Sequence, residues 1–100
     1  MKQLELIGFG QTATEWVAWV TARVRIHVAM HGEITPDDVQ ELCERFDRLP
    51  PHPSCHGRLW ETLRRQGLER TTEERTSRIP SNNARKVRVW RPGPQWGRSR

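Results

Sequence analysis

The sequence predicts a small α+β fold in which three helices are followed by a C-terminal β-hairpin. Three segments repeat apolar residues at helical spacing and carry their own start and stop signals, and a later segment alternates polar and apolar residues as a half-buried strand does. With 100 residues, 34% of them hydrophobic, the chain can build one small core. We expect one domain over residues 12–91, a flexible lead-in or short strand over residues 1–11, and a disordered basic tail over residues 92–100.

The first helix is expected to begin after Thr12 or Thr14, because Thr12 and Glu15 have the spacing of a capping box, and to end at Gly32. Apolar residues at helical spacing give this helix a broad inward face, so it should be the spine of the core. The residues of this face are Trp16, Val17, Val20, Val24 and Val28, with Trp19, Ile26 and Met30 widening it.

The second helix has the clearest start in the chain. Thr35 is the expected N-cap, Pro36 occupies the first helical position, and two acidic residues complement the helix dipole in the first turn. The periodicity predicts a helix over about residues 36–48. The side chains expected to turn inward are Val39, Leu42, Cys43, Phe46 and Leu49. Just before this helix, Ile34 could form a one-residue strand pairing.

The third helix, over residues 54–66, follows the proline-rich turn 50–53, which cannot continue a helix. Ser54 is placed to accept a first-turn backbone N–H as the N-cap. Gly67 has the position of a left-handed terminator, and Leu68 is the apolar residue that folds back after it. The helix has a short apolar stripe and a mostly basic opposite face. The stripe is Leu59, Trp60 and Leu63, and the charged face is Arg58, Glu61, Arg64 and Arg65.

The hairpin is predicted from two short strands, Leu68–Arg70 and Lys86–Trp90, with a long polar loop between them. The loop contains Pro80 and three turn-forming residues, Ser81-Asn82-Asn83. We expect Trp90 to pack against the first helix. Three helices with a terminal hairpin describe a winged helix-turn-helix.

The charge is concentrated in the C-terminal half. Residues 1–50 hold five basic and eight acidic side chains, a balance of −3, and residues 51–100 hold twelve basic and four acidic ones, a balance of +8; together they give the net charge of +5. The excess of positive charge in residues 51–100 indicates a polyanionic partner. Nucleic acid is the commonest such partner, and an anionic membrane surface is the weaker alternative. Arginine usage in a GC-rich genome is an alternative cause of this charge.

Three segments also resemble a known family. The runs E-I-T-P-D-D-V, G-R-L-W-E-T-L-R-R-Q-G-L and E-R-T-S-R-I-P-S-N-N-A-R-K-V-R-V-W are similar, in this order, to small winged-helix proteins of tailed phages and prophages, notably those of actinobacteria. The resemblance covers about residues 33–91. It implies a winged-helix fold, which serves both DNA binding and protein docking.

The expected function is non-enzymatic binding of double-stranded DNA, by a phage or prophage regulator or a DNA-metabolism accessory. In such a fold the third helix enters the major groove, and the hairpin, or wing, contacts phosphates or the minor groove. The candidates on the recognition helix (54–66) are Ser54, His56, Arg58, Glu61, Arg64 and Arg65, with His52 just before it. The candidates in the wing (70–88) are Arg70, Arg75, Ser77, Arg78, Ser81, Asn82, Asn83, Arg85, Lys86 and Arg88.

Within the recognition helix, Arg58 and Arg65 lie two turns apart on one face and could both face the groove, whereas Arg64 lies to the side. A carboxylate at Glu61 would repel phosphate unless it pairs with a neighbouring arginine or accepts from cytosine.

The alternative is a winged-helix module that docks on a host or phage protein. It would use either the C-terminal tail or the acidic surface of the second helix, formed by Asp37, Asp38, Glu41 and Glu44. Whether the protein forms a homodimer stays open at this point.

Catalysis, metals and cofactors are not expected. Cys43, His52, Cys55 and His56 can bind metals, but they lack the two close pairs that tetrahedral zinc requires. A Cys–His nucleophile would have no third orienting group, and the sequence has no Gly-rich phosphate loop. No segment is long and apolar enough to span a bilayer, no signal-peptide pattern is seen, and two cysteines are too few for a disulfide scaffold. We therefore expect a cytoplasmic protein, in the host cytoplasm if phage-encoded.

Overall fold

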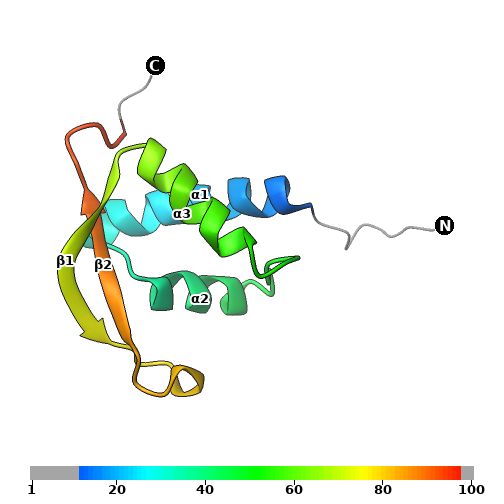
Figure 1. Cartoon of the computed structure of the whole chain (residues 1–100). Helices are drawn as coiled ribbons and strands as arrows, with labels where there is room; N and C mark the ends of the chain where they lie inside the picture. The colour runs from blue at the N-terminus through cyan, green and yellow to red at the C-terminus, as the bar shows by residue number, and fades with distance from the viewer. Residues whose placement is uncertain (1–11, 98–100) are drawn as a thin grey trace.

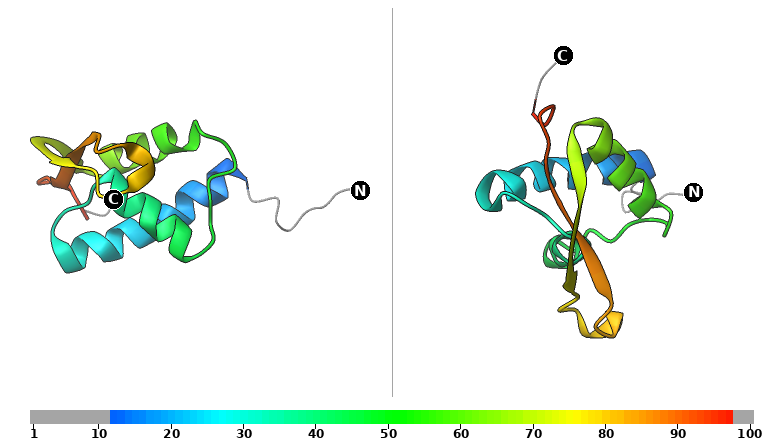
Figure 2. Two further views of the ribbon diagram at one scale, coloured as in Figure 1. Left: turned by 90° about the horizontal axis from the view of Figure 1, so that it is seen from below. Right: turned by 60° about the vertical axis from the view of Figure 1, so that its left-hand side comes forward.

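The computed structural model describes residues 12–97 of the chain (Figure 1). In order, the elements are α1 (Ala13–His31), α2 (Pro36–Arg45), α3 (Cys55–Arg65), β1 (Leu68–Thr76), the 3₁₀ helix η1 (Pro80–Asn82) and β2 (Lys86–Pro92). Three helices followed by a two-stranded antiparallel hairpin confirm the predicted α+β, winged-helix-like fold. The hairpin runs along one side of the helices and extends beyond them, with η1 at its tip (Figures 1 and 2).

Capping boxes start the first two helices, as the sequence predicts. The Thr12 hydroxyl accepts the Glu15 N–H at 3.1 Å, and the Glu15 carboxylate accepts the Thr12 N–H at 2.9 Å. Thr35 and Asp38 make the same exchange at the start of α2. At its other end, α1 stops at Gly32, whose φ of 78° is the left-handed conformation that a glycine adopts at little cost.

The start of α3 differs from the prediction. The Ser54 side chain accepts no backbone hydrogen bond in the first turn of α3. Its Oγ lies 2.8 Å from Nδ1 of His52 instead, so the hydroxyl is used by the preceding turn. The end of α3 follows the prediction, because Gly67 adopts a φ of 106° and Leu68 is fully buried behind it.

The core lies between the helices and the hairpin, with α1 as its spine. Trp16, Val20 and Val24 of α1 are fully buried in one cluster with Leu59 and Leu63 of α3. The apolar stripes of α1 and α3 are thus the two sides of one small core.

One side of the α1–α2 pair is not covered. α2 ends at Arg45, before the predicted end, because the chain turns through Asp47 at a φ of 54°. Phe46 and Leu49, predicted to face inward, are exposed to 39% and 62%, so that prediction is wrong.

The hairpin is longer and its loop shorter than predicted. β1 and β2 pair in antiparallel register, with an irregularity between Arg70 and Glu74. Because β1 continues to Thr76, the hairpin loop shrinks to residues 77–85.

A single β-bridge joins the hairpin to the helical part. Ile34 pairs with Trp90 of β2, which confirms the expected one-residue strand pairing. The ring of Trp90 stacks on that of Trp60 of α3, with centroids 4.8 Å apart. Trp90 thus has an aromatic partner on α3, and it is also buried in the core cluster to which the apolar residues of α1 belong.

The chain after β2 is ordered as far as residue 97, contrary to the expected disorder from residue 92. The Gly93 N–H donates to the Gly67 carbonyl at 2.9 Å, and the Arg25 guanidinium lies 4.9 Å from the centre of the Trp96 ring. A Cβ at Gly67 would overlap the backbone of residues 95–96, so glycine is also needed for this close approach. The predictions for residues 1–11 and 98–100 concern parts of the chain outside the described residues.

Candidate nucleic-acid interface

The predicted recognition arginines of α3 lie in two different settings. Arg58 is exposed and its Nη2 donates to the Thr14 hydroxyl of α1 at 3.4 Å. Arg64 and Arg65 are exposed at the other end of the helix. Arg58 therefore leans toward α1, and the two C-terminal arginines form a separate group.

Glu61 forms ion pairs with both arginines at the C-terminal end of α3. Its carboxylate contacts Arg64 at 2.6 Å and Arg65 at 3.4 Å. The hydrogen bond from Arg64 holds the pKa of Glu61 below its ordinary value, so this side chain stays ionised. One carboxylate shared between two guanidinium groups leaves this end of α3 with a positive charge.

His56 is exposed, and one edge of its surroundings is the core. Its ring lies edge-on to that of Trp16, with centroids 5.4 Å apart. Partial desolvation by its neighbours lowers the pKa of His56, because it disfavours the charged form of the imidazole. His56 therefore remains accessible on α3, with its neutral form favoured.

Three of the predicted wing arginines pair with carboxylates of the same molecule: Arg75 and Arg88 on the strands, and Arg78 in the hairpin loop. Arg75 bridges Glu33 and Glu73, and Arg91 joins the same two carboxylates from β2, which makes a four-membered network. Arg88 pairs with Glu74 at 3.2 Å. Arg75 and Arg88 were predicted to contact phosphates because of their charge alone. In the structure each is paired with a carboxylate, which neutralises that charge.

The hairpin loop is fastened to the first turn of α2. The buried Asp37 carboxylate accepts the Ser77 hydroxyl at 2.8 Å and the Arg78 backbone N–H at 2.9 Å. The Arg78 guanidinium pairs with Asp38 and Glu41, each at 2.6 Å. The prediction that Ser77 and Arg78 are available to DNA is therefore corrected, because Ser77 is buried and Arg78 is paired.

Asn82 belongs to the same loop contact, since its amide donates to the Ser77 hydroxyl at 3.1 Å. The remaining wing candidates are exposed, and within residues 12–97 none of their cations has a carboxylate partner. They are Arg70, Ser81, Asn83, Arg85 and Lys86.

The two exposed arginines at the end of α3 lie close to the exposed arginine at the start of β1. A hollow of about 470 Å³ is lined there by Arg64, Arg65 and Arg70, together with Gly67, Leu68, Glu69 and Gln95. We call it the basic hollow. Three guanidinium groups around one concave surface match the chemistry of a phosphate, which arginine binds through paired N–H donors.

Arg25 is a further basic residue near α3 that was not predicted from the sequence. Its Nη2 donates to the Gln66 side chain at 2.7 Å, and it lines a groove of about 500 Å³ between α1 and α3 together with Arg58. The signal was the small-residue stripe on α1, Thr14, Ala18 and Ala22, which shares a helix face with Arg25.

Stability is expected to fall in two stages on acidification. Burial lowers the pKa of His27, which the nearby Asp38 opposes only in part, and burial also lowers that of His56, both from an ordinary value of 6.5. The unfolded chain then takes up protons at a higher pH than the folded chain, so stability is complete above pH 6.5 and is lost as the pH falls below it. A second loss begins below pH 4.5, because Arg75 lowers the pKa of Glu33, and Arg91 that of Glu73.

Urea unfolding midpoints measured by tryptophan fluorescence across this pH range test the expectation. The double variant His27→Gln, His56→Gln should lack the first stage and keep the second. A wild-type midpoint that stays constant from pH 6.5 to pH 4.5 would contradict it.

Other kinds of site find no support in the described part of the chain. No three His, Cys, Asp or Glu side chains of residues 12–97 are grouped to hold a metal ion, and Cys43 and Cys55 are both buried and unlinked. No helix in this range is both long enough and apolar enough to cross a membrane.

Comparisons of the chain with models of protein families, with curated proteins and with solved structures give no match. The basic hollow and the exposed wing residues are therefore interpreted from their own chemistry.

Proposed function

We propose that the protein binds double-stranded DNA without catalysing a reaction. The observation that carries the proposal is the basic hollow, in which Arg64 and Arg65 of α3 meet Arg70 of β1. Phosphate contacts fix a protein on a duplex, and the exposed outer face of α3 would then lie along the major groove. At the far end of the hairpin, Arg85 and Lys86 would contact phosphates of the same duplex.

The resemblance of residues 33–91 to phage winged-helix proteins supports a role as a phage or prophage regulator or a DNA-metabolism accessory in the host cytoplasm. The structure gives no comparable support to docking through the acidic surface of α2. Asp37, Asp38 and Glu41 are bonded to Ser77 and Arg78, so they stabilise the fold rather than wait for a partner.

A fluorescence-anisotropy titration with random-sequence duplex DNA, repeated from low to physiological salt, tests the proposal. We expect the affinity to fall with a log–log slope of roughly −3 to −5, as about three to five phosphates displace counterions. Absence of binding at low salt would refute the proposal.

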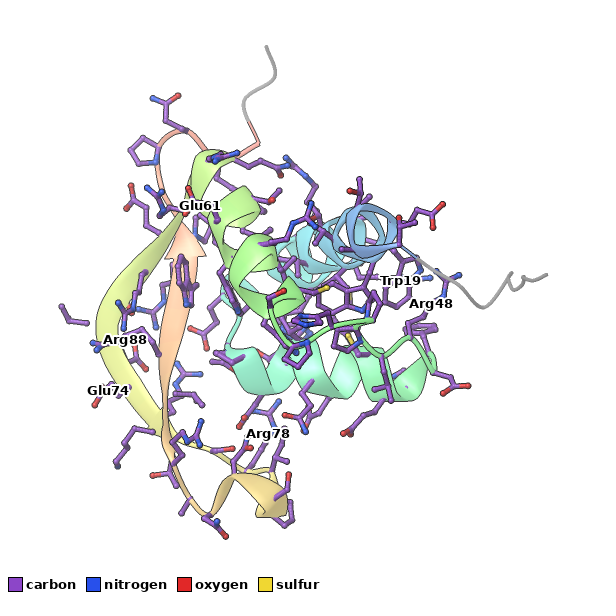
Figure 3. All side chains as sticks on the ribbon, turned by 45° about the vertical axis from the view of Figure 1, so that its right-hand side comes forward. Trp19, Arg48, Glu61, Glu74, Arg78 and Arg88 are labelled. Atoms are coloured by element: carbon purple, nitrogen blue, oxygen red, sulfur yellow. The ribbon has the colours of Figure 1, made fainter. Side chains whose placement is uncertain are left out.

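Variants locate the contact. Arg64→Ala with Arg70→Ala should weaken binding to all sequences and reduce the salt slope by about 2, and Arg85→Ala with Lys86→Ala should act similarly. Arg45→Ala with Arg48→Ala is the matched control, because it removes two exposed cations at the end of α2, and Arg48 lies on the side away from the hairpin (Figure 3). An equal loss for the control would mean that only net charge matters.

A further inference from the structure

The groove of about 500 Å³ between α1 and α3 has an arginine at each end. Arg58, near the start of α3, donates to the Thr14 hydroxyl near the start of α1. Arg25, further along α1, donates to the Gln66 side chain at the end of α3. The two helices therefore run in the same direction along the groove. Thr14 and Arg25 are about three helical turns apart, so the groove is roughly 16 Å long. We call it the α1–α3 groove.

Between its two arginines the α1–α3 groove is mostly apolar and is lined by small side chains. Val17 and Thr21 are buried and form its floor, whereas Ala18 and Ala22 are exposed in it. Small side chains on one helix let another helix approach closely. The Thr21 hydroxyl has no hydrogen-bond partner within residues 12–97, and a buried hydroxyl left unpaired costs free energy. The groove therefore has the surface of a packing site that the described residues leave open.

The two arginines keep their positive charge in this setting. Both are exposed, and neither has a carboxylate partner within residues 12–97. Their contacts are with neutral groups: Arg58 with the Thr14 hydroxyl, and Arg25 with the Gln66 side chain and the Trp96 ring. No Asp or Glu of the same range lines the groove. An acidic partner would complement it, and the neutral contacts reduce the entropy that the arginines lose on binding.

The walls of the groove indicate the conformation of that partner. Both walls are α-helices, whose backbone N–H and C=O groups are hydrogen-bonded within each helix. An extended peptide would find no strand edge here for its own backbone groups, whereas a helix pairs them internally. A DNA backbone would bring phosphates to the arginines but little apolar surface to cover the floor between them. An amphipathic helix provides both kinds of contact.

We propose that the α1–α3 groove binds an acidic amphipathic helix of another protein. The apolar face of that helix would cover Val17, Ala18 and Ala22. Its carboxylates, about three turns apart, would pair with Arg25 and Arg58 through charge-assisted hydrogen bonds. The proposal does not rest on DNA binding, because no residue of the basic hollow lines this groove.

A labelled synthetic peptide of about twenty residues, long enough to form a helix, is the probe. One of its faces carries leucine and alanine, with glutamates three turns apart at the edges of that face, and a matched peptide has glutamine in their place. In fluorescence anisotropy at physiological salt, the glutamate peptide should bind at least about tenfold more tightly than the glutamine peptide. Absence of binding by the glutamate peptide, or equal binding of both peptides, would overturn the proposal.

Arginine variants locate the peptide. Arg25→Gln with Arg58→Gln should weaken binding of the glutamate peptide at least about tenfold. Arg64→Gln with Arg70→Gln is the matched control, because it also removes two exposed cations, and it should bind this peptide as the wild type does. An equal loss in the control would mean that only net charge matters, which would overturn the proposal.

Titration of the same variants with duplex DNA separates this proposal from the proposed function. DNA binding through the basic hollow is expected to suffer in Arg64→Gln with Arg70→Gln, whatever the peptide does. If Arg25→Gln with Arg58→Gln lost affinity for DNA and kept its affinity for the peptide, these two arginines would serve DNA and the proposal would be overturned.

Ala18→Leu with Ala22→Leu tests the groove without changing any charge. Both positions are exposed and leucine is a good helix former, so the variant should fold, which thermal melts check for all variants. The added side chains occupy the groove and should weaken binding of the glutamate peptide at least about tenfold. Wild-type affinity in this variant would show that the peptide binds elsewhere and would overturn the proposal.

Discussion

Replacement of Asp37 by alanine is expected to lower the free energy of unfolding by about 3 kcal/mol and to release the hairpin loop from α2. The buried carboxylate accepts hydrogen bonds from the Ser77 hydroxyl and the Arg78 backbone N–H. Each hydrogen bond to a charged group contributes roughly 1.5–3 kcal/mol, and the donors would be left without a partner near the protein interior. The loss of stability therefore includes the cost of leaving these two donors unpaired, in addition to the loss of the carboxylate.

Urea unfolding followed by tryptophan fluorescence measures the stability, and limited trypsin digestion measures the loop. Cleavage after Arg78 should become faster in Asp37→Ala. Asp37→Asn keeps the shape and one acceptor oxygen, so it should lose less stability. Glu44→Ala, on the exposed side of α2, should change stability by less than about 0.5 kcal/mol. If Asp37→Ala were as stable as the wild type, the loop contact would not contribute to folding.

Trp16→Ala is expected to cost about 3–5 kcal/mol, a large part of the stability of so small a domain. The Trp16 side chain is fully buried in the core. Its Nε1–H donates to the Arg48 carbonyl at 2.8 Å, and its ring meets that of His56. One side chain of α1 therefore holds both ends of the turn between α2 and α3.

Trp16→Phe separates the two contributions. Phenylalanine keeps much of the buried ring but cannot donate to the Arg48 carbonyl, so we expect a loss of about 1–2 kcal/mol. Urea unfolding of the two variants under the same conditions gives the comparison. Equal losses would show that the hydrogen bond, not the buried volume, accounts for the effect.

The elements with local signals could be predicted from the sequence. Thr12 with Glu15, and Thr35 with Asp38, mark helix starts within a single turn, and Gly32 and Gly67 mark ends through their own backbone conformation. Such features depend only on near neighbours in the chain, so the fold class followed from them.

The site was harder to predict because its chemistry depends on partners far apart in the chain. Arg78 and Ser77 looked like wing contacts, yet they bind Asp37, about forty residues earlier. A count of charges shows how many arginines there are, but not which of them neutralise a carboxylate of the same molecule. The inward orientation predicted for Phe46 and Leu49 was wrong for a related reason. Helical spacing predicts which side chains share a face, but it does not predict whether another element covers that face.

The bridge between Ile34 and Trp90 has a kinetic consequence. Each residue donates its N–H to the carbonyl of the other, at 2.9 Å in both directions. The bridge closes a segment of chain that contains α2, α3 and β1, and the entropy lost in closing so long a loop is recovered only when those elements are in place. Helices and hairpin should therefore reach the native state in one cooperative step rather than as two modules that fold in turn.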